Sequence, residues 1–299
     1  MARNNNDGCF NRPLEPYFYL APFIIGVILW TLYPVINVFL ISFKENYRFL
    51  SGNFSGYGLA NYARILNDPH FLSAIKNTAI YVAIVVPIST SLSVIIATLL
   101  NNKIKGMAIF QTAFFLPLVT SATAVGLVWK LMFNTNFGAI NNILKLLNLS
   151  PIHWLDHSNM NIYALIIFGI WNIMPFTIIL VLSGLQNIDP MYYTVAKVDG
   201  AKTAKIFFRI TLPLLAPTIG LILIINTISL SKVYTELFTL FNGSPGATYN
   251  LYTVVFYIYD RFYVKDQLAI ASAASVILFL ILFILTMLQL AIQRRWKRY

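Results

Sequence analysis

Long apolar runs alternate with shorter polar segments along almost the whole chain. We expect six such runs, at about residues 17–43, 74–100, 107–133, 161–184, 213–240 and 266–293. Each run has about 20 or more residues, which is long enough for a helix to cross a hydrocarbon layer about 30 Å thick. Inside lipid every backbone polar group must be satisfied within its own segment, so the runs are expected to be helices. A transmembrane barrel would need short alternating segments, and this pattern does not provide them.

Composition supports a membrane protein. The chain is 58% hydrophobic and only 10% charged, with a mean hydropathy of +0.71, and a water-soluble domain of this length hardly needs so apolar a balance. The first run is too long for a signal-peptide core and shows no small-residue cleavage pattern, so we expect it to be retained. We therefore divide the chain into an N-terminal tail (1–16), a transmembrane domain (17–293) and a basic tail (294–299).

Prolines lie inside several of the expected spans. A membrane bundle tolerates such breaks because neighbouring groups re-satisfy the freed carbonyls. These prolines mark either kinks that serve packing or hinges that serve gating: Pro22, Pro34, Pro87, Pro117 and Pro175.

The basic residues that give the net charge of +11 are concentrated in certain loops and in the two tails. About 12 of the 21 basic residues fall in the tails and in the loops after the second and fourth spans: Arg3, Arg12, Lys103, Lys105, Lys197, Lys202, Lys205, Arg209, Arg294, Arg295, Lys297 and Arg298. The positive-inside rule makes these segments cytoplasmic, so both termini are expected in the cytoplasm. Membrane topology accounts for the charge, and no nucleic-acid partner is expected.

The segment between the fourth and fifth spans, residues 187–212, has strong local signals. Asp189 followed by Pro190 is an N-cap acceptor followed by a residue preset for the first helical turn. One helical face then carries Met191, Val195 and Val198. Gly200 can take the left-handed conformation that ends a helix. We expect a short helix, a sharp glycine turn and a second, basic helix; by shape alone this is also compatible with an amphipathic linker at the membrane surface.

The order of residues in this segment is more specific than its shape. The run VDGAKTAKIFFRITLPLLAP resembles the signature of binding-protein-dependent ABC transporter permeases, in which Glu-Ala-Ala is followed by Asp-Gly-Ala and then by Ile, Leu-Pro and Pro. The matching positions are Ala196, Asp199, Gly200, Ala201, Phe207, Ile210, Leu212, Pro213 and Pro217. Where the family places Glu-Ala-Ala, this chain has Thr194, Val195 and Ala196. The acid that the family has at this position is absent here, so Thr194 forms no ion pair with a partner.

Three further segments are similar to the sugar branch of this family, and within it to the first permease of the pair, of the maltose or glycerol-phosphate type. They are GLANYARILNDPHFLSAIKNT (58–78), FGAINNILKLLNLSPIHWL (137–155) and WNIMPFTIILVLSGLQNI (171–188). The resemblance implies an all-α, six-helix type I ABC importer transmembrane domain in the bacterial cytoplasmic membrane. Residues Thr194, Val195, Ala196, Asp199, Gly200 and Ala201 would then belong to a cytoplasmic coupling helix that docks on an ATPase.

The resemblance also implies partners: a second, homologous permease, two cytoplasmic ABC ATPases and an external solute-binding protein, all surrounded by membrane lipid. The sequence contains no glycine-rich phosphate loop ending in Gly-Lys-Ser or Gly-Lys-Thr, so we do not expect this chain to be an enzyme or to hold a cofactor. His153 and His157 stand four apart near Asp156 and could ligate a metal if helical. Pro151 and Trp154 favour a packed loop instead, and no metal site is expected.

Charges inside the expected spans are rare, which draws attention to Lys232 and Glu236. They stand four apart, so they either neutralise each other on one helical face or mark a solute path. A sugar needs aromatic faces beside hydrogen-bonding groups, and the candidates on the fourth and fifth spans are Trp171, Asn172, Asn226, Tyr234 and Glu236. The expected cargo is an oligosaccharide. The alternative is glycerol phosphate or another small polar solute, although a phosphate would favour arginines in the path, and none lies deep in a span.

Two other classes of membrane protein fit the sequence less well. A self-contained secondary transporter or channel should show broken helices in two repeated halves, or several titratable groups inside its spans. A membrane-embedded enzyme should show acids or histidines clustered near one membrane face. The sequence shows neither pattern, so an ATP-driven importer permease is the function that we expect.

Overall fold

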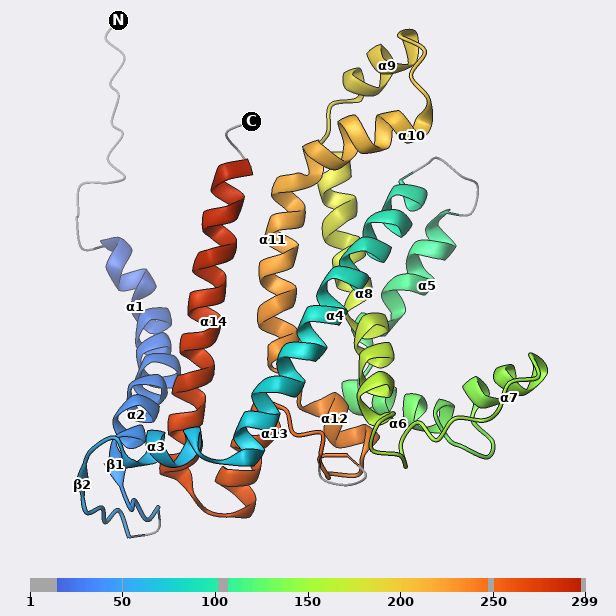
Figure 1. The fold of residues 1–299 in the computed structure, drawn as a ribbon. Helices are drawn as coiled ribbons and strands as arrows, with labels where there is room; N and C mark the ends of the chain where they lie inside the picture. Colours follow the sequence, from blue (N-terminus) through green and yellow to red (C-terminus); the bar gives the residue numbers. More distant parts are fainter. Residues whose placement is uncertain (1–14, 50, 102–106, 247–249, 297–299) are drawn as a thin grey trace, which may run out of the picture.

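The computed structural model describes residues 15–49, 51–101, 107–246 and 250–296, and Figure 1 shows a bundle of long helices with short elements at its two ends. The expected tails, 1–16 and 294–299, lie largely outside the described residues. The long helical runs are α1 (Glu15–Val27) with η1 (Ile28–Leu32) and α2 (Tyr33–Ser42), α4 (Pro69–Leu100), α8 (Asn161–Gln186), α11 (Leu212–Ser231) and α14 (Leu268–Trp296).

Shorter elements connect these runs. Those in the first half of the chain are β1 (Lys44–Glu45), β2 (Gly56–Tyr57), α3 (Ala60–Leu66), α5 (Met107–Val119), α6 (Ala122–Met132) and α7 (Ala139–Leu146). The later ones are α9 (Pro190–Val198), α10 (Thr203–Ile206), η2 (Phe207–Thr211), α12 (Thr235–Leu240), α13 (Val254–Tyr259) and η3 (Asp260–Val264). The two strands form a minimal antiparallel ladder, which the sequence analysis did not predict.

Among the described residues, five helical runs are long and apolar enough to cross a membrane, or six if one bent pair is counted as a span. The first, second, fourth and sixth expected spans agree with α1–α2, α4, α8 and α14 to within a few residues. The third expected span, 107–133, consists of two helices, because α5 and α6 meet at an angle of 111°, and it counts as one span only if this bent pair is taken together. Pro117 lies near the end of α5, and Ser121 has an extended backbone that separates the two helices.

The fifth expected span, 213–240, is also corrected. Its helical run begins earlier, at Thr203, and ends at Ser231. Lys232 and Tyr234 leave helical backbone geometry, and α12 then begins at Thr235 as a separate short helix. Lys232 and Glu236 therefore do not share the face of one helix, which removes the geometric basis for their predicted pairing.

The core is built around α4 and α8, which form the most extensive helix pairing, with α11 packed against both. Little hydrophobic force drives helices together in lipid, so close approach depends on small residues. Gly169 of α8 provides one such contact, because its backbone lies directly against the ring of Tyr81 on α4. Both residues belong to the tightly packed centre of the bundle, where Tyr81 is 1% exposed.

The two ends of the bundle carry different elements. At one end Figure 1 places α9 and α10 beyond α8 and α11, with the start of α1 and the end of α14 at the same end. The opposite end carries the β1–β2 ladder together with α3, α6, α7, α12 and α13. We call these the α9 end and the α13 end. Because α1 starts and α14 finishes at the same end, the arrangement agrees with an even number of crossings.

Candidate functional site

At the α9 end, local chemistry builds the helix–turn–helix that the sequence predicted. Asp189 caps α9, because its side chain accepts a hydrogen bond of 2.8 Å from the backbone N–H of Met191, and Pro190 occupies the first turn. Gly200 has a φ of +69° and ends the helix. These local predictions are confirmed.

The turn after α9 closes with two backbone hydrogen bonds. The N–H of Ala201 donates to the carbonyl of Ala196 at 2.9 Å, and the N–H of Gly200 donates to the carbonyl of Lys197 at 3.0 Å. This is the Schellman arrangement, which satisfies the last carbonyls of a helix and requires a left-handed residue at the glycine position. The next residues lead directly through α10 and η2 into α11. A short, hydrogen-bonded turn therefore joins α9 to a helical run long enough to cross a membrane.

Helix α9 has a buried face and an exposed face. Ala196 is 7% exposed, and Tyr193 packs against the core cluster of α8 and α11. The exposed residues on the other side are largely apolar: Met191, Tyr192, Val195 and Val198. A hollow of about 500 Å³ lies beside them, lined by Asp189, Met191, Tyr192, Val195, Ala196, Asp199 and Ile210. The face predicted from Met191, Val195 and Val198 is thus a solvent-facing apolar surface suited to a protein partner.

The candidate path residues do not form one cluster. Asn172 of α8 and Glu236 of α12 meet, because the amide nitrogen of Asn172 donates to Oε1 of Glu236 at 3.2 Å. Trp171 is exposed and its ring lies 5.4 Å from that of Trp129 on α6. The break after α11 is what brings α12 and its carboxylate to α8. Among the described residues Glu236 has no ion pair with Lys232, which caps the end of α11 and is exposed.

Asn226 and Tyr234 lie in different surroundings. Asn226 is fully buried, and its amide donates to the Thr177 hydroxyl at 3.0 Å, so it ties α11 to α8 in the interior of the bundle. Tyr234 is half-buried among aromatic rings, with ring centres of Phe256 and Tyr259 at 5.9 and 5.0 Å. The cluster of aromatic residues therefore includes α13, which the sequence analysis had not considered.

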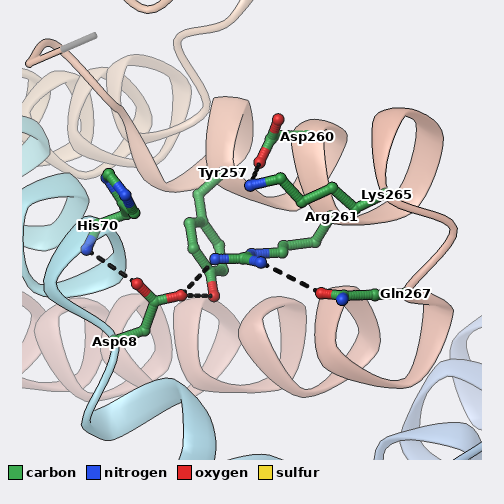
Figure 2. A network of polar contacts seen from close by, with 7 residues as sticks. All are labelled: Asp68, His70, Tyr257, Asp260, Arg261, Lys265 and Gln267. Carbon is green, nitrogen blue, oxygen red and sulfur yellow. Dashed lines mark hydrogen bonds and ion pairs between the residues drawn. The ribbon is translucent and has the colours of Figure 1, made fainter.

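Sequence reasoning also missed a charged contact at the α13 end. Asp68, which caps α4, meets Arg261 and Tyr257 from the α13–η3 segment (Figure 2). The available signal was a single arginine within the aromatic run FYIYDRFYV. Its partner could not be read from the sequence, because the two residues are 193 positions apart. His153 and His157 form no candidate metal group with other side chains in the part of the chain that the structure describes.

Comparison with known proteins identifies relatives along almost the whole chain. The family described as "Binding-protein-dependent transport system inner membrane component" matches residues 52–298. The arabinooligosaccharides transport system permease protein AraP of Bacillus subtilis (strain 168) is 31% identical, over 96% of this chain and 91% of that protein. The trehalose/maltose transport system permease protein MalF of Thermococcus litoralis is 30% identical, over 93% of each chain.

The fold has a solved counterpart. A chain in the crystal structure of a bacterial ABC transporter involved in the import of the acidic polysaccharide alginate superposes with a TM-score of 0.82. The alignment covers 94% of this chain and 95% of the other at 24% sequence identity. The likeness establishes the fold of the bundle.

Proposed function

The chain belongs to the family of binding-protein-dependent transport system inner membrane components, and on this premise we propose that it is a permease subunit of an ATP-driven sugar importer. Members of this family are permeases and not themselves enzymes. The observation that carries the mechanism is the α9 turn: an apolar, solvent-facing helix joined to a membrane-crossing run by the Schellman turn at Gly200. In our proposal this helix docks on a cytoplasmic ATPase.

The proposed assembly contains a second, homologous permease, two ATPase subunits and an external solute-binding protein. The apolar window of the first span is 0% buried within this chain, so lipid or another subunit covers it in the membrane. The α9 end would lie in the cytoplasm with both termini, in the bacterial cytoplasmic membrane. The orientation rests on the positive-inside rule applied to the whole sequence, which counts the basic residues of both tails together with Lys197, Lys202, Lys205 and Arg209.

We infer that the cargo is a neutral oligosaccharide. Both named relatives, at 30% identity or more, are called transporters of sugars. The polar pair Asn172–Glu236 also favours a neutral cargo over glycerol phosphate. Glu236 presents a carboxylate, and the group that hydrogen-bonds to it is the neutral amide of Asn172. A carboxylate repels a phosphate, whereas carboxylates and amides both hydrogen-bond sugar hydroxyls.

Transport would proceed by alternating access. ATP binding and hydrolysis in the partner subunits would move α9, and the helical run from Thr203 to Ser231 would follow as a nearly rigid piece. The carboxylate of Glu236, the amide of Asn172 and the ring of Trp171 are the groups of this chain that we assign to the sugar path. Asn226 stays in our proposal as a residue beside that path that holds α11 against α8.

The test uses the purified importer, obtained by tagging this chain and collecting the subunits that remain bound. Gly200→Val should reduce ATP-driven uptake at least about tenfold, because a left-handed residue with a side chain costs about 1–2 kcal/mol and more if β-branched. Gly200→Asn should retain most uptake, since asparagine tolerates this conformation. No described atom lies within 4 Å of a Cβ added at Gly200, so the effect comes from the backbone and not from a clash.

Gly52 is the matched control. It has a φ of +68° and equally open surroundings, but it lies in the loop before β2 at the α13 end. Gly52→Val imposes the same backbone strain away from α9 and should leave uptake near that of the wild type. Equal uptake in Gly200→Val and wild type would refute the coupling role of α9. A tagged chain that carries sugar into liposomes without any ATPase subunit would refute the importer assignment.

A further inference from the structure

A partly buried ion pair joins two distant segments at the α13 end. Nη2 of Arg261 lies 2.5 Å from Oδ2 of Asp68, and the Tyr257 hydroxyl donates to the same oxygen at 2.8 Å (Figure 2). The backbone N–H of His70 donates to the other carboxylate oxygen at 2.9 Å, as part of the cap of α4. We call Asp68, Tyr257 and Arg261 the corner network. It fixes the beginning of α4 to α13 and η3.

The corner network is well shielded from solvent. The side chains of Arg261 and Asp68 are only 14% and 15% exposed. The Arg261 guanidinium also lies over the Tyr257 ring, 4.9 Å from its centre, and donates to Oε1 of Gln267 at 3.2 Å. Partial burial raises the pKa of Asp68, but the hydrogen bonds from Tyr257 and His70 and the charge of Arg261 together lower that pKa below its usual value. Asp68 is therefore ionised at neutral pH.

A second ion pair on η3 joins residues that are close together in the sequence. Lys265 pairs with Asp260 at 2.9 Å at the end of the same short helix, and its side chain is 38% exposed. The Asp260 side chain is only 13% exposed, so both residues must be changed together to avoid leaving an unpaired, shielded charge. The pair joins no other segment to η3, so its removal provides a control for the corner network.

The segment held by the corner network carries an aromatic surface. Tyr259 lies two residues before Arg261, and its ring stacks on that of exposed Tyr263, with centres 5.4 Å apart and planes at 16°. On its other side Tyr259 faces Tyr234, whose ring centre is 5.0 Å away. Tyr234 immediately precedes α12, the helix that carries Glu236. Neighbouring rings thus connect exposed Tyr263 through Tyr259 to Tyr234, the residue that precedes α12.

We propose that Tyr259 is a sugar-stacking residue at the mouth of the transport path and that the Asp68–Arg261 pair is the contact that positions it. The apolar faces of sugar rings pack on aromatic rings, and tyrosine adds a hydroxyl that can hydrogen-bond to the sugar. The inference rests on the proposed sugar-import function. It assigns a specificity role to α13, and it gives the corner network a task other than holding the fold.

The first test replaces the ring. The complete importer in proteoliposomes, with its binding protein, is assayed for uptake of arabinotriose, maltotriose and raffinose. For the trisaccharide carried by the wild type, Tyr259→Leu should raise KM about tenfold, whereas Tyr259→Phe should stay within about threefold of wild type because it keeps the ring. ATP hydrolysis should be unchanged in both variants, since Tyr259 is remote from α9. Tyr259 is half-buried among other aromatic rings, so size-exclusion chromatography of each variant first verifies that the importer assembles.

The second test separates positioning from stability. Asp68→Asn keeps an oxygen to cap α4 but loses the charge, and it should raise KM about threefold to tenfold. In a Tyr259→Leu background, Asp68→Asn should raise KM little further, because the ring that the Asp68–Arg261 pair positions is already absent. A purely structural role would give additive losses in the two backgrounds. The double variant Asp260→Asn with Lys265→Met, which removes both charges of the pair on η3, should leave KM at the wild-type value.

The outcomes separate the two proposals. Wild-type importer that carries none of the three trisaccharides in an ATP-dependent manner would overturn the proposed oligosaccharide cargo. Wild-type uptake with an unchanged KM in Tyr259→Leu would overturn the stacking role alone. Additive effects of Asp68→Asn and Tyr259→Leu would overturn the positioning role. If the Asp68→Asn variant does not assemble, Arg261→Lys replaces it in the same double-mutant cycle. Lysine keeps the charge, but it cannot hydrogen-bond to Asp68 and Gln267 with the planar fork of a guanidinium.

Discussion

The close contact between Gly169 and Tyr81 leads to a quantitative prediction about the helix pair α4–α8. A Cβ at Gly169 would lie 2.1 Å from the Tyr81 hydroxyl oxygen, 2.7 Å from Cζ and 2.9 Å from Cε2. The first distance is roughly 1.3 Å below the 3.4 Å at which ordinary contact begins. Tyr81 is 1% exposed, so its ring has no free space into which it can turn. Gly169→Ala must therefore push α4 and α8 apart or force Tyr81 from its rotamer.

Overpacking of this kind costs about 1–3 kcal/mol, and we expect the upper half of that range because the obstacle is a buried ring. At about 2–4 °C per kcal/mol, the midpoint of thermal unfolding should fall by about 4–12 °C. The assay is tryptophan fluorescence of the purified importer during heating. Gly26→Ala is the control, because no described atom lies within 4 Å of its added Cβ and alanine favours the helix.

A second substitution, at Tyr81, tests the same contact between Gly169 and Tyr81. Tyr81→Phe removes the oxygen that lies closest to the new Cβ but leaves the ring carbon at 2.7 Å. In the Gly169→Ala background it should recover part of the lost stability, so the two changes should be non-additive in the favourable direction. If Gly169→Ala unfolds at the wild-type temperature, the two helices are not as close as described and the packing argument fails.

Two further predictions concern buried polar groups. Asn226→Asp should cost several kcal/mol and reduce the yield of assembled importer, because it buries a charge against the Thr177 hydroxyl; size-exclusion chromatography measures this, and a monodisperse variant at the wild-type yield would contradict it. The stability that Asp68→Asn loses should be constant from pH 5 to 8. The pKa of Asp68 is depressed, so its contribution is complete above the usual carboxyl value of 3.8 and disappears as the pH falls through the lower folded-state value. Thermal unfolding of the wild type and of Asp68→Asn is measured from pH 3 to 8. A difference between their unfolding temperatures that already shrinks between pH 8 and 5 would contradict the prediction.

Local signals in the sequence were sufficient wherever the determining residues are neighbours in the chain. The apolar runs predicted most of the spans, because a membrane-crossing helix satisfies its backbone within one segment. Asp189 and Gly200 predicted the start and end of α9 for the same reason: a cap and a left-handed turn involve residues only a few positions apart. The role of that helix in docking an ATPase stays a prediction.

Tertiary structure decided everything that depends on contacts between distant segments. Hydropathy could not reveal the 111° bend between α5 and α6, because the two sides of the bend together form one long apolar run. The sequence allowed Glu236 either to pair with Lys232 or to mark a solute path, and the break after α11 turns it towards Asn172 of α8. Asp68 and Arg261 are 193 positions apart, and only the packing of α13 against α4 brings their charges together. A sequence determines which segments become helices, whereas the side chains that meet between helices are determined by how those helices pack.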